Sequence, residues 1–136
     1  MKRVRGYLLD THVWLWHLLA DNRLSRRARK LIDDSLAECW LSPISIWETR
    51  MLIERGRFQV EGDFRAWVER ADDSLPLRPA PLVDEVALAC FEIDLPHRDP
   101  ADRFLAATAT VYGLSLITAD RRLLDARSLT TISASA

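Results

Sequence analysis

Short apolar runs alternate with helical segments along this chain, and this alternation limits the folds that it can adopt. Three runs rich in strand-forming residues lie at residues 4–9, 39–42 and 114–118. Each is closely followed by a segment whose apolar residues recur with helical spacing. Strands that alternate with helices in this way favour a mostly parallel sheet covered by helices on both faces. We therefore predict an α/β fold.

The remaining segments extend this pattern. Their apolar spacing predicts helices at residues 25–37, 63–72, 82–93 and 99–113, and a last strand at 129–132. Three prolines between residues 75 and 81 indicate a connector, with an edge strand at 75–77. A length of 136 residues suits one domain. We expect a single domain over residues 1–136, with residues 133–136 as a flexible tail.

Charge and cysteine usage narrow the possible functions. The formal net charge is −1, so the chain as a whole has no basic field that would attract nucleic acid without selectivity. Two local cation clusters can still meet phosphates: Arg26, Arg27, Arg29 and Lys30 in one, and Arg121, Arg122 and Arg127 in the other. Two cysteines without zinc-ligand spacing indicate a reducing compartment. We expect a cytoplasmic protein that does not span a membrane, because charges interrupt every long apolar stretch.

Asp10 is the first of four carboxylates in apolar surroundings. It follows the run Tyr7-Leu8-Leu9 and precedes a helical segment. As a helix N-cap alone it would contribute about 1 kcal/mol. A carboxylate at the carboxyl end of a central parallel strand also points into the crevice where open α/β sheets bind ligands. Asp120 repeats this arrangement after the run at 114–118. For both Asp10 and Asp120, the sequence is therefore compatible with a helix cap and with a ligand-binding residue.

Glu48 is the most unusual of the four. Ile44, Trp47, Met51 and Leu52 define the apolar side of its predicted helix, and Glu48 lies among them. A charged side chain in such a position needs hydrogen-bond donors, a cationic partner or a metal. The pattern therefore indicates either a metal ligand or a buried pair between Glu48 and an arginine.

Asp99 and Asp102 begin the helix predicted for residues 99–113. Asp99 precedes Pro100, which is typical of an N-cap followed by proline in the first helical position. Asp102 lies one turn before Leu105, on the apolar side, and is the better ligand candidate.

These four carboxylates suggest a common chemistry. Oxygen ligands without a Cys or His motif favour Mg²⁺ or Mn²⁺. Such an ion activates water beside a phosphate, so phosphodiester hydrolysis is the natural reaction. A dehalogenase-type phosphohydrolase is disfavoured because His12 stands where its second aspartate would be. Glycine-rich nucleotide-binding motifs are absent from the sequence.

Four motifs cover nearly the whole chain. They are Leu8-Leu9-Asp10-Thr11-His12, Leu41-Ser42-Pro43-Ile44-Ser45-Ile46-Trp47-Glu48, Asp99-Pro100-Ala101-Asp102-Arg103-Phe104-Leu105-Ala106-Ala107 and Leu116-Ile117-Thr118-Ala119-Asp120. In this order they resemble the PIN-domain ribonucleases, and within them the VapC toxins of bacterial type II toxin–antitoxin pairs. The resemblance implies a three-layer α/β/α fold and places the catalytic, metal-binding acids at Asp10, Glu48, Asp102 and Asp120. It gives as secondary candidates Asp99, Thr11, Ser45 and Thr118. Ala101 departs from the aromatic residue that is frequent in such toxins.

The resemblance also implies an activity and partners. It predicts a Mg²⁺- or Mn²⁺-dependent endoribonuclease that hydrolyses RNA phosphodiester bonds, forms a homodimer and is the toxin partner of a cognate antitoxin. A housekeeping PIN nuclease without antitoxin and a non-catalytic PIN-like RNA-binding or scaffold protein are the alternatives, and retention of all four acids favours a nuclease. Five tryptophans either belong to the core or line a groove for an antitoxin peptide or a dimer partner: Trp14, Trp16, Trp40, Trp47 and Trp67.

Overall fold

The computed structural model describes residues 5–96 and 98–135, apart from the side chain of Arg5. Within these residues, five strands form one sheet in the order β3-β2-β1-β4-β5, with every neighbouring pair parallel. The strands are β1 (Arg5–Leu9), β2 (Ala37–Leu41), β3 (Arg78–Pro79), β4 (Ser115–Thr118) and β5 (Thr131–Ser133). Because all strands run the same way, their carboxyl ends lie along one edge of the sheet.

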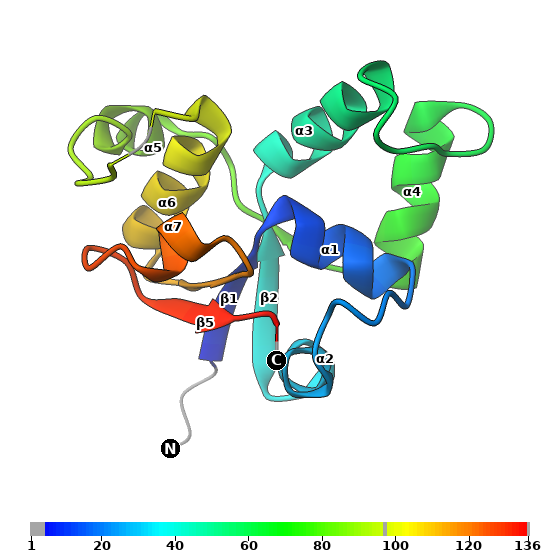
Figure 1. Ribbon diagram of the computed structural model, residues 1–136, viewed down its shortest axis with the longest axis horizontal. Coiled ribbons are helices and arrows are strands. Elements are labelled where there is room, and N and C mark those ends of the chain that lie inside the picture. Colours follow the sequence, from blue (N-terminus) through cyan, green and yellow to red (C-terminus); the bar gives the residue numbers. More distant parts are fainter. Residues whose placement is uncertain (1–4, 97, 136) are drawn as a thin grey trace.

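Helices cover both faces of this sheet, as Figure 1 shows. The helices are α1 (Thr11–Leu18), α2 (Arg26–Asp33), α3 (Pro43–Glu54), α4 (Phe64–Ser74), α5 (Asp84–Ala89), α6 (Pro100–Tyr112) and α7 (Arg121–Leu124). The group α1, α2 and α4 lies on one side of the strands, and α5, α6 and α7 lie on the other (Figure 1). The predicted α/β/α sandwich with a parallel sheet is confirmed.

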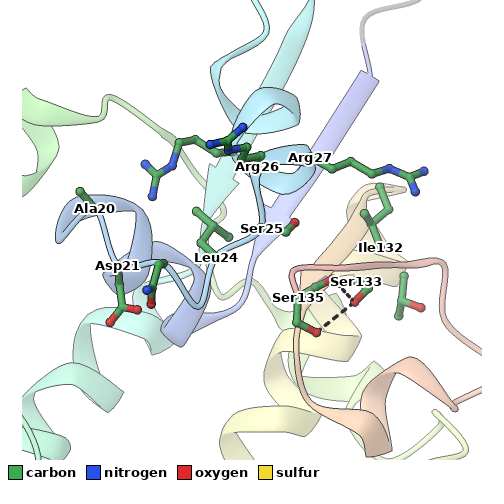
Figure 2. Close-up of a pocket in the computed structure, with 12 residues that line it drawn as sticks. Ala20, Asp21, Leu24, Ser25, Arg26, Arg27, Ile132, Ser133 and Ser135 are labelled. Carbon is green, nitrogen blue, oxygen red and sulfur yellow. Dashed lines mark hydrogen bonds between the residues drawn. The ribbon is translucent and has the colours of Figure 1, made fainter.

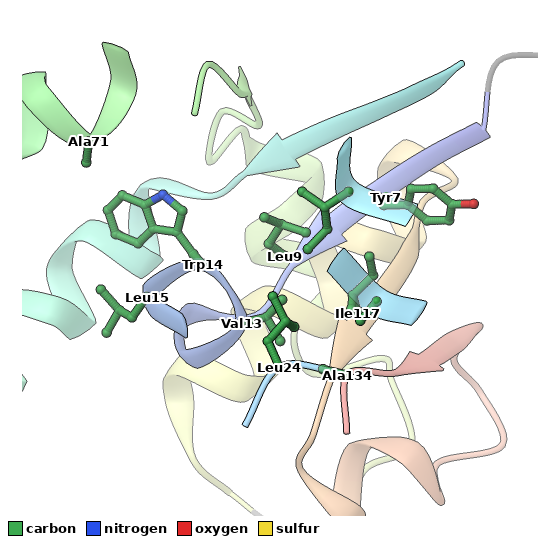
Figure 3. Packing of buried hydrophobic residues seen from close by; sticks show 11 residues of the cluster. Tyr7, Leu9, Val13, Trp14, Leu15, Leu24, Ala71, Ile117 and Ala134 are labelled. Carbon is green, nitrogen blue, oxygen red and sulfur yellow. The ribbon is translucent and has the colours of Figure 1, made fainter. Parts of the chain in front are cut away.

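The central strand β1 is buried on both faces because its side chains alternate between two cores. Tyr7 and Leu9 pack on the side of α1 and α2, around Val13 (Figure 3). Leu8 points the other way and packs with Leu105 of α6. This two-sided burial explains the continuous apolar run that precedes Asp10.

Most of the tryptophans belong to these cores. Trp14 is buried and its ring meets Trp67 edge-on, while Trp16 and Trp40 are partly buried against the cores. Trp47 is the exception, since 55% of its surface is exposed.

The ends of α6 follow their local sequence signals. The Asp99 side chain accepts a hydrogen bond from the Ala101 amide and caps the helix in front of Pro100. At the other end, Gly113 has a φ of 66°, a left-handed conformation that favours glycine, and the Leu114 amide donates to the Ala109 carbonyl at 2.8 Å. The predicted N-cap role of Asp99 is confirmed.

Several predicted boundaries differ from the structure. Helix α2 ends at Asp33 rather than at residue 37, and α5 ends at Ala89 rather than at residue 93. The edge strand lies at Arg78–Pro79 rather than at 75–77, and the last strand lies at Thr131–Ser133 rather than at 129–132. The chain leaves α2 because the Asp34 carboxylate and carbonyl accept the amides of Leu36 and Ala37 in a turn. After α5 the Glu92 amide donates to the Ala89 carbonyl in a turn, and the Arg103 guanidinium binds the carbonyls of Cys90 and Leu95.

The expected flexible tail at residues 133–136 differs from the structure as well. Ser133 is the last residue of β5, and Ala134 is fully buried. The Ala134 amide donates to the Thr118 carbonyl, and the Ala134 carbonyl accepts from the Ser25 amide, each at 2.9 Å. Ala136 lies outside the described residues. The prediction relied on the serine and alanine composition of this segment, which gives no indication of these backbone hydrogen bonds.

In the part of the chain that the structure describes, no helix is long and apolar enough to cross a membrane.

Candidate active site

The carboxyl ends of β1 and β4 bring two of the predicted acids together. Asp10 follows β1, and its amide donates to the Ile117 carbonyl in β4 at 3.0 Å. The Thr118 hydroxyl, at the end of β4, donates to Asp10 Oδ2 at 2.6 Å and accepts the Asp120 amide at 3.0 Å. One side chain therefore links Asp10 to the turn that carries Asp120.

Asp10 is both a helix cap and a buried charge. Its Oδ1 atom accepts the Thr11 amide at 2.7 Å at the start of α1, and only 8% of the residue is exposed. Burial raises the pKa of the Asp10 carboxyl, while the Thr118 hydrogen bond, the nearby His12 and the Thr11 amide oppose that rise. Of the two roles left open by the sequence, the N-cap is confirmed, and ligand binding by this buried carboxylate stays a prediction.

Glu48 reaches the same edge from α3. Its Oε1 atom lies 2.5 Å from the Thr11 hydroxyl, which is also 2.9 Å from Ser45 Oγ. Burial raises the pKa of Glu48 to about 7; the Thr11 hydrogen bond opposes this rise, and the charges of Asp10, Asp102 and Asp99 add to it. These couplings place Glu48 within the electrostatic reach of the other acids.

The alternative of a buried Glu–Arg pair is not supported at Glu48. Among residues 5–96 and 98–135, no arginine or lysine forms an ion pair with it. Its surroundings also differ from the predicted ones. The buried side of α3 is formed by Ser45 and Thr49, whereas Trp47 points to solvent. Glu48 is therefore bordered by small hydroxyl residues rather than by a fully apolar stripe.

Asp102 and Asp120 share a cationic neighbour. Asp102 lies in the first turn of α6 and is only 7% exposed. Arg122 places Nη2 3.1 Å from Asp120 Oδ2 and 3.5 Å from Asp102 Oδ2. Asp120 also caps α7 by accepting the Arg122 amide at 2.9 Å. The guanidinium thus bridges two of the four predicted ligands.

This position of Arg122 was not predicted from the sequence. Arg122 was expected only to belong to a cluster of cations that can meet phosphates. The available signal was the spacing Asp-x-Arg, since a residue two positions after an N-cap lies in the first helical turn, beside the capping carboxylate. Thr49 was also missed; its hydroxyl donates to the Ser45 carbonyl inside α3.

The donor set fits a hard divalent cation. All four acids offer carboxylate oxygens, and the raised pKa values of Asp10 and Glu48 show that this region disfavours further negative charge. In the described part of the chain, no three acidic, histidine or cysteine side chains are already gathered as a cation site. The acids are held instead by their own partners: Asp10 by Thr118, Glu48 by Thr11, and Asp102 and Asp120 by Arg122.

Comparison with known proteins identifies the family of this chain. The sequence matches the PIN domain family over residues 7–129. The chain belongs to the PIN-domain family. It is 35% identical over 121 residues to Ribonuclease VapC22 of Mycobacterium tuberculosis (strain ATCC 25618 / H37Rv), covering 85% of this chain and 88% of that protein.

Solved structures support the same fold. VapBC2 from Rickettsia felis, bound to a DNA fragment from its promoter, has a chain that superposes with a TM-score of 0.68 at 13% identity, covering 94% of this chain and 98% of that one. DNA-bound VapBC from Salmonella typhimurium gives a TM-score of 0.68 at 16% identity, covering 95% and 98%. At these identities the likeness concerns the PIN fold alone.

The bridging position of Arg122 in this PIN domain leads to a test. Arg122→Ala is expected to tighten Mn²⁺ binding by roughly two- to fivefold, because it removes a cation that competes for Asp102 and Asp120 and an ion pair with an exposed guanidinium is weak. Isothermal titration calorimetry measures the dissociation constant. Arg121→Ala is the matched control, since it removes the same charge next to the site. An equal gain in both variants would assign the effect to net charge and not to the bridge.

Proposed function

We propose that this PIN domain is a Mg²⁺- or Mn²⁺-dependent endoribonuclease that hydrolyses RNA phosphodiester bonds. The observation that carries the proposal is the position of Asp10 and Glu48, two buried or half-buried carboxylates with raised pKa values at the carboxyl edge of the sheet. The 35% identity to Ribonuclease VapC22 over most of both chains supports RNA as the substrate.

Some residues of the site are proposed to bind the cation, and others orient the side chains that bind it. Asp10, Glu48, Asp102 and Asp120 are the proposed ligands. Thr118 and Thr11 orient the carboxylates of Asp10 and Glu48 through the hydrogen bonds described above. When bound, the divalent cation neutralises charge on the scissile phosphate and lowers the pKa of a water molecule so that it can attack.

Ser45 and Asp99 have supporting roles in this proposal. Ser45 lies against the Thr11 hydroxyl and fixes its position. Asp99 caps α6 and adds negative charge near Glu48, which makes it a weaker ligand candidate than the other four.

The biological role extends the same proposal. We infer that the chain is the toxin of a toxin–antitoxin pair, acts in the cytoplasm, forms a homodimer and is inhibited by a cognate antitoxin. The support is the 35% identity to Ribonuclease VapC22 over most of both chains. A housekeeping nuclease would share the acids but lack the antitoxin.

Metal dependence is the direct test of the activity. Purified protein is expected to cleave a labelled single-stranded RNA with Mg²⁺ or Mn²⁺ and to lose cleavage in excess chelator. The same cations are expected to raise the melting temperature, because a ligand that binds only the folded state stabilises it, by about 2.7 kcal/mol at a hundredfold excess over its dissociation constant. This second measurement does not depend on turnover.

Two outcomes would contradict the proposal. Cleavage that persists in chelator would exclude the metal mechanism. RNA binding without cleavage under any of these cations would favour the non-catalytic alternative.

A further inference from the structure

Helix α2 concentrates positive charge on a chain whose net charge is −1. Four of its eight residues are cationic, namely Arg26, Arg27, Arg29 and Lys30. Arg26, Arg27 and Lys30 are exposed. None of the four forms an ion pair with a residue that the structure describes. Some other surface arginines are paired, as in Arg23–Asp21 and Arg50–Glu54. The charge of α2 is therefore available to an anionic ligand.

These cations line a hollow between α2 and the edge strand β5. Figure 2 shows Arg26 and Arg27 on one side of it, with Ile132, Ser133 and Ser135 on the other. The hollow has a volume of about 1070 Å³. A second hollow of about 630 Å³ shares Arg26, Arg27 and Ile132 with the first. The two hollows adjoin at these shared residues and are here together called the α2–β5 groove.

Two carboxylates also border the α2–β5 groove. Asp21 is engaged by Arg23, whose Nη2 lies 2.7 Å from its Oδ2. Asp34 borders the second hollow, and its Oδ1 accepts the Leu36 amide. Both acids already have partners within the fold, so the unpaired charges that face the groove are the arginines and Lys30.

The groove begins close to the proposed active site. The Ser25 amide, at the start of α2, donates to the Ala134 carbonyl, and the Ala134 amide donates to the Thr118 carbonyl. The Thr118 hydroxyl in turn donates to Asp10. Three consecutive hydrogen bonds thus connect the rim of the groove to the buried acid, along the carboxyl edge of β4 and β5.

We propose that the α2–β5 groove binds the phosphate backbone of the RNA substrate, beyond the segment that is cleaved. This inference rests on the proposed function. Unpaired arginines are suited to phosphates because the guanidinium presents several donors in one plane. A cationic groove whose rim is linked to Asp10 by three consecutive hydrogen bonds fits a polymer that continues past the cleaved bond, and backbone contacts of this kind require no particular base.

The test measures RNA binding separately from cleavage. A labelled single-stranded oligouridine is titrated with protein in chelator, and its fluorescence anisotropy is followed at increasing KCl. The double variant Arg26→Ala/Arg27→Ala is expected to reduce the slope of log affinity against log salt by about 1.4, since each phosphate contact on a single strand contributes about 0.7. The matched control is Arg55→Ala/Arg57→Ala, which removes two exposed arginines that form no ion pair with the described residues.

Cleavage kinetics supply a second comparison. With Mn²⁺, the double variant is expected to raise KM for the long oligouridine severalfold and to leave kcat unchanged. A dinucleotide substrate has no strand beyond the cleaved bond and so offers the groove no further phosphate; its cleavage is expected to be the same in variant and wild type. Arg26→Lys/Arg27→Lys keeps the charge and is expected to retain most of the salt slope.

Three results would overturn this inference. The first is an unchanged slope in the α2 variant, and the second is an equal change in the Arg55/Arg57 control. The third is tighter binding of polyglutamate than of oligouridine, with only the former lost in the variant, which would make the groove a protein-docking surface. If wild-type protein cleaves RNA with Mn²⁺ and any of these occurs, only this inference fails. If wild type does not cleave with any divalent cation, the proposed function fails.

Discussion

Asp10→Asn is expected to reduce RNA cleavage by a thousandfold or more and to leave the protein folded. The amide keeps the size of the side chain, and its oxygen can still accept the Thr11 amide at the start of α1. It removes the negative charge that the cation requires. A loss of about 4 kcal/mol of transition-state stabilisation corresponds to roughly a thousandfold in rate. Initial rates with Mn²⁺ and thermal melts followed by circular dichroism measure the two effects.

The expected change in the stability of Asp10→Asn has a defined sign. Burial raises the pKa of Asp10, so the ionised carboxylate is unfavourable in the metal-free fold. Replacing it with a neutral amide is expected to leave the melting temperature in chelator unchanged or higher. Asp63→Asn is the matched control, because Asp63 is an exposed N-cap whose carboxylate accepts the Ala66 amide. A large fall in melting temperature together with lost activity would indicate that Asp10 acts only through capping.

Glu48→Gln is expected to weaken Mn²⁺ binding strongly without destabilising the metal-free protein. The Gln oxygen can still accept the Thr11 hydroxyl, while the half-buried negative charge is lost. Calorimetry of Mn²⁺ binding and urea unfolding in chelator test the two parts. Glu54→Gln on the same helix removes an exposed carboxylate paired with Arg50 and serves as control.

The pH dependence of Glu48→Gln gives an independent check. The pKa of Glu48 is about 7 in the folded protein, above its ordinary value of 4.5. Between these values the folded state holds a proton that the unfolded state has lost, so wild-type stability in chelator falls as pH rises from about 4.5 through about 7. The Gln variant is expected to lack this part of the decline. Identical pH profiles would show that Glu48 does not carry the shifted titration, and a collapse in stability would favour a structural role.

Asp10, Asp120 and Asp99 were predictable from the sequence because their positions depend on local signals. A strand ends, a helix begins, and the side chain between them caps the helix or faces the crevice at the sheet edge. These signals lie within a few residues of each acid. The membership of the PIN-domain family was likewise predicted from four motifs and is confirmed.

Arg122 and Trp47 were not predictable in the same way. The bridge from Arg122 to Asp102 depends on how α7 lies against α6, which no spacing along the chain specifies. The apolar pattern predicted that Trp47 would be buried. In the structure the buried side of α3 is formed by Ser45 and Thr49, and Ser45 hydrogen-bonds to Thr11 of α1. The positions of Arg122 and Trp47 therefore depend on how the helices pack in the folded chain.

The Thr118–Asp10 hydrogen bond joins residues that are 108 positions apart. A chain leaves the ribosome from its N-terminus, so Asp10 emerges 108 residues before Thr118. Until β4 docks beside β1, Asp10 lacks both its hydroxyl donor and its partner acid. The order of synthesis therefore delays assembly of the site until β4 and the turn after it have been made, and a nascent chain that stops before them carries no complete set of acids.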